Sequence, residues 1–327
     1  MRRRAAVGLI HGAAMRRKLK DGAVQQSAMI GRVDPKALRP NRSRETLLPR
    51  TVTFPAAVVV TLWCVVGAPI GDALAGPPER VGFEGASQRL ISGGLIRGDR
   101  IEGYLAKPEG AGPFPAVIGL HGCAAMPGTT RRKLVDELVG WGYVVLLVDS
   151  LATRGIEHAC AGGFSDIAGN RRWDAYGALA FLARQTFVDP KRVAAVGFSQ
   201  GGWVNLLVAE ASSFELFGRH SNLGFRTVVA FNPVCKGVVG PLVIPTLILI
   251  GALDQWTPAA HCAEKIDAWR TGGQPIELVV YPDTHHGFYY QELQSGRTVF
   301  GYWLEYNEEA AADATRRMRE FLNRHLN

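Results

Sequence analysis

The sequence predicts an α/β fold: a single domain with a doubly wound, mostly parallel sheet and helices on both of its faces. From Gly76 onward, short aliphatic and β-branched runs alternate with segments of helical periodicity. The composition, 47% hydrophobic and 20% charged, is that of an ordinary globular protein. No stretch rich in Pro, Gly or Ser is long enough to be a linker, so we expect residues 76–327 to form one domain.

The expected elements follow one another in chain order. Residues 90–105 predict two antiparallel strands that turn near 97–100. Further strands are expected at 116–120, 144–148, 192–197, 227–231, 246–250 and 276–281, and helices at 130–141, 171–185, 201–211, 259–270 and 308–325. In such a sheet, ligands bind at the carboxyl ends of the strands, so the residues that follow each strand are the candidates for chemistry.

The N-terminal part of the chain predicts a basic leader. Residues 1–54 hold 13 Lys and Arg against three Asp and Glu, which accounts for the whole net charge of +8. The rest of the chain is near neutral, and this excludes the electrostatic footprint of a nucleic-acid-binding protein.

An apolar run at 54–69 follows the basic residues, and Ala73, Leu74 and Ala75 then form a small-x-small site before Gly76. This order is typical of a secretory signal peptide, so we expect cleavage after Ala75, export to the periplasm or medium, and no stable membrane association afterwards. An uncleaved anchor helix is the alternative. Because the leader is unusually long, a mis-assigned translation start is an alternative for residues 1 to about 50. Translation would then begin at Met29 or at a non-Met initiator.

The strand expected at 192–197 runs directly into Gly197-Phe198-Ser199-Gln200-Gly201 and then a helix. A Gly-x-Ser-x-Gly segment between a strand and a helix is typical of the nucleophile elbow, in which a sharp turn exposes the serine oxygen. The pattern by itself is weak, and a Gly-rich turn with an ordinary serine is the alternative. The position between strand and helix favours Ser199 as a nucleophile.

A serine nucleophile needs a base, and the base needs a residue that orients it. Asp254 follows the strand at 246–250, and His286 follows the strand at 276–281, which gives the chain order Ser, Asp, His. We prefer His286 to His285 because Gly287 leaves room for the imidazole. Asp254 as a helix N-cap and Asp283 as the orienting acid are the alternatives.

The negative oxygen of a tetrahedral intermediate needs two preorganised donors. The backbone N–H of Gln200 is one candidate, and the N–H of Cys123, in the loop after the strand at 116–120, is the other. His121 is expected to pack or to form hydrogen bonds beneath that loop rather than to act as a base. Cys123 as a nucleophile is the remaining alternative, although no elbow surrounds it.

These segments together resemble the dienelactone hydrolase family of α/β-hydrolases. The resemblance rests on HGC after the strand at 116–120, GFSQGG at the elbow, GALDQWTP and YPDTHHGF, and it covers roughly residues 94–327. It implies a triad of Ser199, Asp254 and His286, no metal, no organic cofactor, and hydrolysis of a small-molecule ester or lactone through an acyl-enzyme. The founding enzymes use a cysteine where this chain has Ser199, which puts dienelactone itself in doubt as the substrate.

The family's strand order also bears on the four cysteines that follow the leader. It makes neighbours of the strands at 116–120 and 144–148, and of those at 227–231 and 246–250. It therefore implies disulfides between Cys123 and Cys160 and between Cys235 and Cys262, whereas reduced, buried thiols are the alternative.

Candidates for substrate binding are few. Arg154 follows the strand at 144–148 and is a candidate for a substrate carboxylate, with a structural salt bridge as the alternative. Trp203, Trp256, Phe288 and the neighbouring Tyr289 are candidates to line an apolar pocket, although Trp203 also suits the core. For Arg171, Arg172 and Asp174 we expect the solvated, charged end of a helix.

Two other functions remain open at this point. An acyltransferase or a peptidase would use the same three residues. A non-catalytic, exported binding protein of the same fold is an alternative of a different class, although the triad positions are all filled. The substrate and the oligomeric state do not follow from the sequence.

Overall fold

A central sheet of eight strands organises the chain. The computed structural model describes residues 77–89, 94–160 and 164–327. The strands lie in the order β1-β4-β6-β5-β7-β8-β9-β10. Their bounds are β1 Glu79–Glu84, β4 Arg100–Ala106, β5 Phe114–Leu120, β6 Val144–Asp149, β7 Val188–Phe198, β8 Thr227–Phe231, β9 Thr246–Gly251 and β10 Ile276–Tyr281.

Five neighbouring pairs in this sheet are parallel, and the edge that contains β1 and β4 is antiparallel. β5 pairs in parallel with both β6 and β7, and β7, β8, β9 and β10 continue in parallel. β1 pairs antiparallel with β4, which in turn pairs antiparallel with β6. The predicted mostly parallel α/β fold is therefore confirmed.

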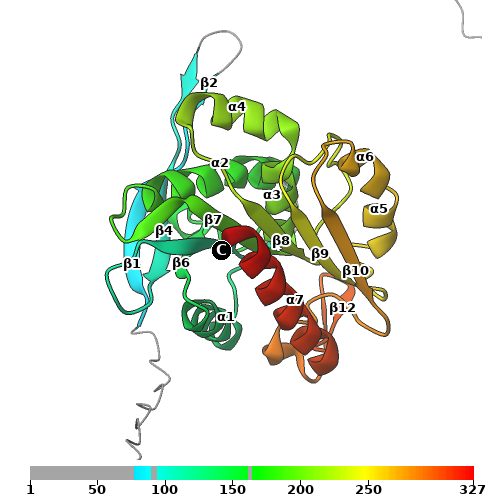
Figure 1. Ribbon diagram of the computed structural model, residues 1–327. Helices are drawn as coiled ribbons and strands as arrows, with labels where there is room; N and C mark the ends of the chain where they lie inside the picture. The colour runs from blue at the N-terminus through cyan, green and yellow to red at the C-terminus, as the bar shows by residue number, and fades with distance from the viewer. Residues whose placement is uncertain (1–76, 90–93, 161–163) are drawn as a thin grey trace, which may run out of the picture. The chain divides into compact units, whose positions relative to one another are not determined.

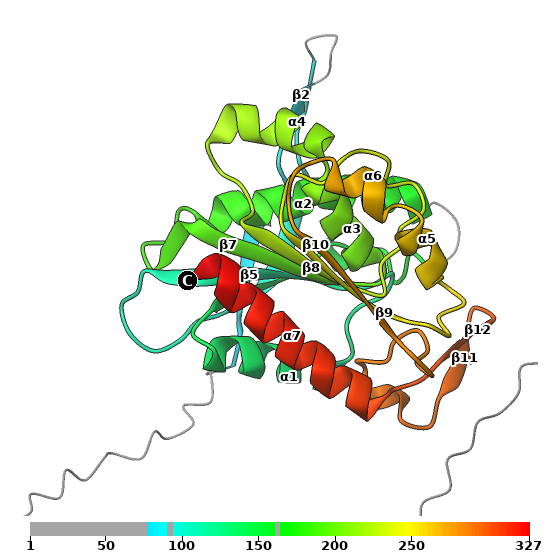
Figure 2. The ribbon, with the colours of Figure 1, turned by 45° about the vertical axis from the view of Figure 1, so that its right-hand side comes forward.

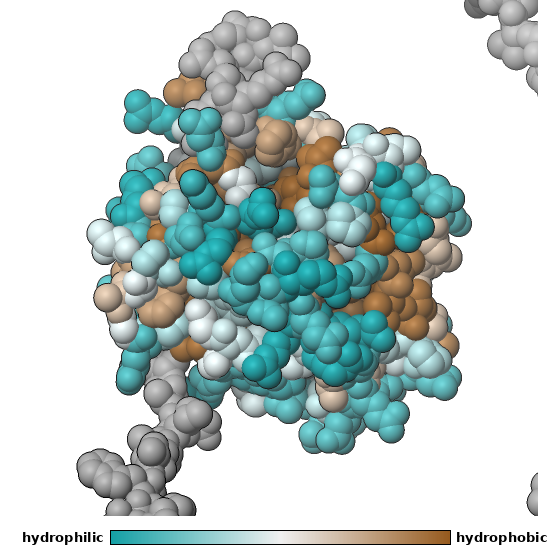
Figure 3. All heavy atoms as spheres, in the orientation of Figure 1, coloured by the Kyte–Doolittle hydropathy of each residue, from teal (hydrophilic) through white to brown (hydrophobic). Residues whose placement is uncertain are grey.

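Helices cover both faces of the sheet (Figures 1 and 2). α1 (Gly128–Gly140) and α7 (Glu308–Leu326) pack on one face, and α2 (Phe164–Leu182), α3 (Gln200–Ala209), α5 (Ala259–Ala263) and α6 (Ile266–Arg270) pack on the other. The outer surface over α7 is largely hydrophilic (Figure 3).

Alternation along each strand explains how the sheet divides the core in two. Ile118 and Leu120 of β5 belong to the cluster beneath α2 and α3, whereas Val117 belongs to the cluster beneath α1 and α7. Successive side chains of a strand point to opposite faces, so a strand that is apolar throughout is buried on both. The continuous apolar runs in the sequence are the consequence.

The predicted pairing within residues 90–105 is wrong. β4 pairs with β1, a strand that was not predicted, and β3 (Leu95–Ile96) pairs with β2 (Gln88–Arg89). β1 lies at the edge of the sheet and is mostly exposed, with Phe83 as its buried residue, so it lacks the apolar run of the central strands. Residues 90–93 of the predicted pair lie outside the described residues.

Three helical segments differ from those predicted. The helix expected at 171–185 is α2, which begins at Phe164. The helix expected at 201–211 ends at Ala209, because Glu210 is extended and its carboxylate accepts the backbone N–H groups of Val239 and Gly240; α4 (Ala211–Ser221) follows. The helix expected at 259–270 is divided into α5 and α6.

A short hairpin of β11 (Arg297–Val299) and β12 (Tyr302–Leu304) lies between β10 and α7 and was not predicted. An isolated bridge joins Leu304 to His286, so this hairpin lies beside the segment that follows β10. All the elements described above belong to one compact unit of the chain.

Candidate active site

Ser199 lies at the sharp turn between β7 and α3. Its backbone has φ 52° and ψ −114°, a conformation that residues with a side chain rarely adopt. Its N–H donates to the carbonyl of Phe231 at the end of the neighbouring strand, over 2.8 Å. The turn therefore holds the serine in a strained conformation at the carboxyl end of the sheet.

Two glycines make this turn possible. A Cβ on Gly197 would lie 2.3 Å from the carbonyl oxygen of Gly201, and a Cβ on Gly201 would lie 2.3 Å from that of Leu120. Backbone atoms occupy both positions, so no side chain fits at either glycine. The glycine spacing in the sequence thus reflects how closely α3 approaches β7 and the end of β5.

The structure brings Ser199, His286 and Asp254 together from three different loops. His286 Nε2 lies 3.1 Å from Ser199 Oγ, and His286 Nδ1 lies 2.7 Å from Asp254 Oδ2. Both His286 and Asp254 are buried. With Nδ1 protonated and donating to Asp254, Nε2 is free to accept the proton of the serine hydroxyl.

Hydrogen bonds hold the Asp254 carboxylate in the charged form. Oδ2 accepts from Asn232 Nδ2 and Thr257 Oγ1, each over 2.7 Å, and Oδ1 accepts the backbone N–H groups of Trp256 and Thr257. Burial raises the pKa of Asp254, but His286 and these hydrogen bonds together outweigh it, so the pKa is lower than usual. The sequence reasoning missed Asn232, which follows β8 at the same edge of the sheet.

The alternatives for the base and the acid are not favoured by the geometry. The N-cap of α5 is Pro258, so Asp254 does not cap that helix. His285 faces Glu305, with Nε2 3.9 Å from its carboxylate, and Asp283 is exposed. The reason given for preferring His286 is wrong, because a Cβ on Gly287 would meet Leu293, and the glycine is needed for its φ of 76°.

The loop after β5 passes beside Ser199. A Cβ on Gly122 would lie 3.6 Å from Ser199 Cβ, which puts the peptide between Gly122 and Cys123 next to the serine. Cys123 forms a disulfide with Cys160, so it has no thiol, and its alternative role as a nucleophile is excluded. The second disulfide joins Cys235 and Cys262, as the resemblance implied.

His121 is neutral and supports this loop from within. Its Nε2 accepts the N–H of Ser150, and its Nδ1 donates to the carbonyls of Gly122 and Ala124 over 2.9 and 3.0 Å. Burial, assisted by the nearby charge of Arg171, lowers the pKa of His121 to about 3. The ring therefore serves as a hydrogen-bonding support, as we expected.

The charged residues of α2 contradict the expectation of a solvated helix end. Arg171 is 0% exposed and contacts the loop after β5, and Asp174 is buried. Asp174 pairs with Arg154 over 2.7 Å, and Arg154 also donates to Asp99 and to the carbonyl of Ser150. These contacts commit the guanidinium of Arg154 to the protein, so its predicted role in binding a substrate carboxylate is corrected to a structural salt bridge.

Among the predicted apolar lining residues, only Trp256 lies beside the site. Its ring centroid is 5.1 Å from that of His286. Trp203, Phe288 and Tyr289 are buried in the two cores, so they are corrected to packing residues. These three residues are close in sequence to Ser199 or His286, but their side chains point into the layers between the sheet and the helices.

Aromatic side chains from the β11–β12 hairpin extend the surface at Trp256. Tyr302 stacks on Trp256 with a centroid distance of 5.1 Å, and Phe300, 50% exposed, lies 6.1 Å from it. Phe300 also contacts His158, which precedes the disulfide partner of the Cys123 loop. The cluster of Phe300, Tyr302 and Trp303 in the sequence is the feature from which this aromatic surface could have been predicted.

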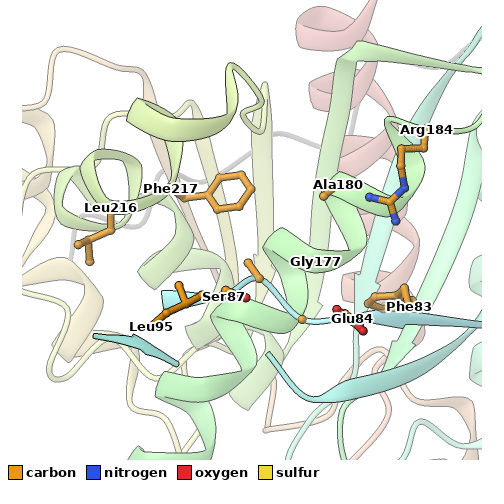
Figure 4. A pocket seen from close by; sticks show the side chains of 11 residues that line it. Phe83, Glu84, Ser87, Leu95, Gly177, Ala180, Arg184, Leu216 and Phe217 are labelled. Carbon is orange, nitrogen blue, oxygen red and sulfur yellow. The ribbon is translucent and has the colours of Figure 1, made fainter. Parts of the chain in front are cut away.

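A separate cavity of about 650 Å³ lies away from these residues. Leu95 and Leu216 lie on one side of it and Phe83 and Arg184 on the other (Figure 4). None of Ser199, Asp254 and His286 lines it. Within the described part of the chain, no group of three or more His, Cys, Asp or Glu is placed to hold a metal ion, and no helix has both the length and the apolar character to span a membrane.

Comparisons with known proteins identify a matching family and several relatives of this chain. The sequence profile of the dienelactone hydrolase family matches residues 101–326. The chain is 30% identical over 221 residues to an uncharacterized peptidase, YtmA, of Bacillus subtilis, a match that covers 59% of this chain and 84% of that protein. It is 25% identical over 244 residues to a protein of Methylorubrum extorquens that is provisionally named a carboxymethylenebutenolidase, covering 69% and 77% of the two chains.

A solved structure supports the fold. A dienelactone hydrolase-like promiscuous phosphotriesterase from metagenomic libraries superposes with a TM-score of 0.60 at 19% sequence identity. The match covers 77% of this chain and all of that one. At this identity the likeness bears on the arrangement of strands and helices alone.

Proposed function

Since the chain belongs to the dienelactone hydrolase family and is thus an ester-hydrolysing enzyme, we propose that it cleaves a carboxylic ester or lactone through an acyl-enzyme on Ser199. His286 acts as general base and then as general acid, and Asp254 orients it. The observation that carries the proposal is the continuous chain of hydrogen bonds from Ser199 Oγ through His286 to Asp254 Oδ2.

In the acylation step, Ser199 Oγ attacks the carbonyl carbon of the ester while its proton passes to His286 Nε2. The carbonyl π bond opens, and its electron pair becomes the negative oxygen of a tetrahedral intermediate. Collapse of the intermediate breaks the bond to the alcohol, which takes the proton from His286 as it leaves. The acyl group is then esterified to Ser199.

In the deacylation step, water takes the place of the alcohol. His286 accepts a proton as the water oxygen bonds to the acyl carbon, and returns it to Ser199 Oγ when the acid is released. Throughout, the N–H groups of Cys123 and Gln200 would donate to the negative oxygen. The position of Gly122 beside Ser199 supports the first of these donors, and the place of Gln200 at the first residue of α3 supports the second.

The substrate we propose is a small-molecule ester with an apolar or aromatic group. Trp256, beside His286, and the half-exposed Phe300 supply the apolar surface. A peptidase is the second candidate, because the relative in Bacillus subtilis is named as one. A p-nitrophenyl ester and a p-nitroanilide with the same acyl group separate the two activities.

We further propose that the chain is exported and that residues 1–75 are a removable leader. Two disulfides support this, because they are typical of proteins that fold in an oxidising compartment. The predicted cleavage site after Ala75 lies outside the described residues. Intact-mass measurement of the protein recovered from the periplasm or the medium of expressing cells tests both the export and the cleavage site, and a retained N-terminus would contradict the proposal.

The experiment that tests the proposed function compares the wild-type chain with Ser199→Ala. We expect hydrolysis of short-chain p-nitrophenyl esters and labelling of Ser199 by a fluorophosphonate, located by peptide mass, and the loss of both in the variant. Label on another serine would mean that the nucleophile is misassigned. A folded wild-type chain with neither activity nor label would favour a non-catalytic binding protein.

A further inference from the structure

Arg171 contacts both segments that carry the proposed oxyanion donors. Its Nη1 donates to the carbonyl of Gly122 over 2.9 Å and to Gln200 Oε1 over 2.7 Å, and its Nη2 donates to the carbonyl of His121 over 2.7 Å. The residue is 0% exposed, and so is Gln200. A single guanidinium thus ties the loop after β5 to the first residue of α3.

The positive charge of Arg171 is not neutralised by a carboxylate at contact distance. Asp174, one turn further along α2, pairs with Arg154 instead. Among the residues that the structure describes, no acid forms a salt bridge with Arg171, and the oxygens it contacts belong to two carbonyl groups and one amide. Burial lowers the pKa of Arg171 to about 10, which leaves it protonated at neutral pH.

Asp174 and Asp149 attract the Arg171 charge from beyond contact distance. A buried cation without a carboxylate in direct contact still opposes folding, because its desolvation is not offset by a contact ion pair. The carbonyl and amide oxygens around Arg171 reduce this cost but do not remove it. A methionine or leucine would fill part of this space in a helix without such a cost. The charge is therefore a feature that packing alone does not explain.

The Gly122 carbonyl and the Cys123 N–H belong to the same peptide group. A hydrogen bond from a cation to the oxygen draws electron density away from the nitrogen, which makes the N–H a stronger donor on the opposite side. Arg171 makes this bond on the side of the loop that faces α2, and Ser199 lies next to Gly122.

We propose that Arg171 is a positioning residue for the oxyanion hole: it fixes the Cys123 and Gln200 donors relative to each other and polarises the peptide that carries the Cys123 N–H. This inference rests on the proposed function. The effect is greatest in the transition state, because the negative charge is present on the substrate oxygen only there and in the tetrahedral intermediate. The loss of Arg171 should therefore lower kcat and leave KM nearly unchanged.

The test uses the full chain with Arg171→Met, which keeps an unbranched apolar stem but removes the charged guanidinium, and Arg171→Lys, which keeps the charge but not the forked donor geometry. Arg172→Met is the matched control, since Arg172 is the next residue of α2 and packs on Trp173 instead of the loop. Circular dichroism and thermal melting identify the variants that are folded.

Two quantities are measured for each folded variant. The first is kcat and KM for p-nitrophenyl acetate. The second is the inhibition constant of an alkyl trifluoromethyl ketone, to whose carbonyl carbon the serine adds, so that the bound inhibitor carries a negative oxygen. The inhibition constant of the matching methyl ketone is measured beside it and reports ground-state binding. A residue that only supports the fold would not weaken the first inhibitor selectively.

For Arg171→Met we expect kcat to fall by about 10- to 100-fold with KM within about twofold, and the trifluoromethyl ketone to bind more weakly by a similar factor. For Arg171→Lys we expect a smaller loss of the same kind, about 3- to 10-fold, and for Arg172→Met no change. The methyl ketone should bind equally to all of them.

The inference is overturned if a folded Arg171→Met or Arg171→Lys enzyme retains kcat within about twofold, or if it loses affinity for both ketones alike. Should the methionine variant fail to fold, the lysine variant decides by the same criteria. A wild-type chain that neither hydrolyses the ester nor binds the trifluoromethyl ketone would instead refute the proposed function, and this inference with it.

Discussion

The backbone conformation that exposes Ser199 lowers the stability of the fold. Ser199 has a φ of 52°, where glycine is strained less than any other residue. We therefore expect Ser199→Gly to raise the free energy of unfolding by about 1 kcal/mol relative to Ser199→Ala, while both variants lose esterase activity. Urea denaturation measures the difference. Equal stabilities would mean that the turn stores no strain.

His121 makes the stability of the fold depend on pH. Its pKa in the folded chain is lowered to about 3, so the unfolded chain binds more protons between about pH 3 and the ordinary value for histidine. The contribution of a neutral His121 is complete above that ordinary value and declines as the pH falls below it. We expect a loss of about 2–3 kcal/mol between pH 7 and pH 4.5.

The measurement is urea denaturation of wild type and His121→Asn at both pH values. Asparagine does not titrate, and its amide can donate to the Gly122 carbonyl that His121 Nδ1 contacts. The variant should be less sensitive to pH than the wild type by roughly the amount above. An identical pH dependence in the two proteins would show that other groups are responsible.

At the scale of elements, the β11–β12 hairpin extends the surface beside His286. Trp256 lies between His286 and Tyr302 of β12, while Trp303, the next residue of that strand, bonds to Glu305. We expect Trp256→Ala to raise KM for a phenylacetyl ester by about 3- to 10-fold more than for the acetyl ester, because burial of the aromatic group on Trp256 is lost.

Trp303→Ala is the control for this prediction, because successive residues of a strand point to opposite faces. It removes an exposed aromatic side chain of the same hairpin without changing the stack on Trp256. Steady-state kinetics with both esters check the outcome. A change in KM that is the same for the two esters would indicate a general distortion of the site.

At the scale of the whole molecule, the two disulfides should stabilise the fold to a similar extent. Their cysteines are 37 and 27 residues apart, and closing loops of such lengths restricts the unfolded chain to a similar extent. We expect replacement of either pair by serine to lower the free energy of unfolding by about 2–4 kcal/mol.

Activity should separate the two pairs. Cys123 belongs to the loop beside Ser199, so the variant without the Cys123–Cys160 bond should also lose kcat, whereas the variant without the Cys235–Cys262 bond should retain it. Denaturation and steady-state kinetics on the two double variants test this. Equal kcat values in both would mean that the disulfide is not needed to position the loop.

Residues that follow strands were predictable from the sequence. Parallel strands must be apolar on both faces, so their runs are visible, and the polar residues that come directly after them meet at one edge of the sheet. This logic located Ser199, Asp254 and His286, whose side chains the structure brings within hydrogen-bond distance. The edge strand β1 and the short hairpin lack such runs, because they are partly exposed and draw their stability from their neighbours.

The sequence by itself determined the parallel α/β fold and the order of the candidate catalytic residues, because both follow from local patterns of polarity and glycine. Only the tertiary structure decided which charges are buried. From the sequence, Arg171 was expected in solvent and Arg154 was a candidate for binding substrate, yet Arg171 contacts the loop beside Ser199 and Arg154 forms a salt bridge with Asp174. Whether a charged side chain is buried, and which group it pairs with, depends on segments that are distant in sequence but pack together. Local periodicity does not indicate those contacts.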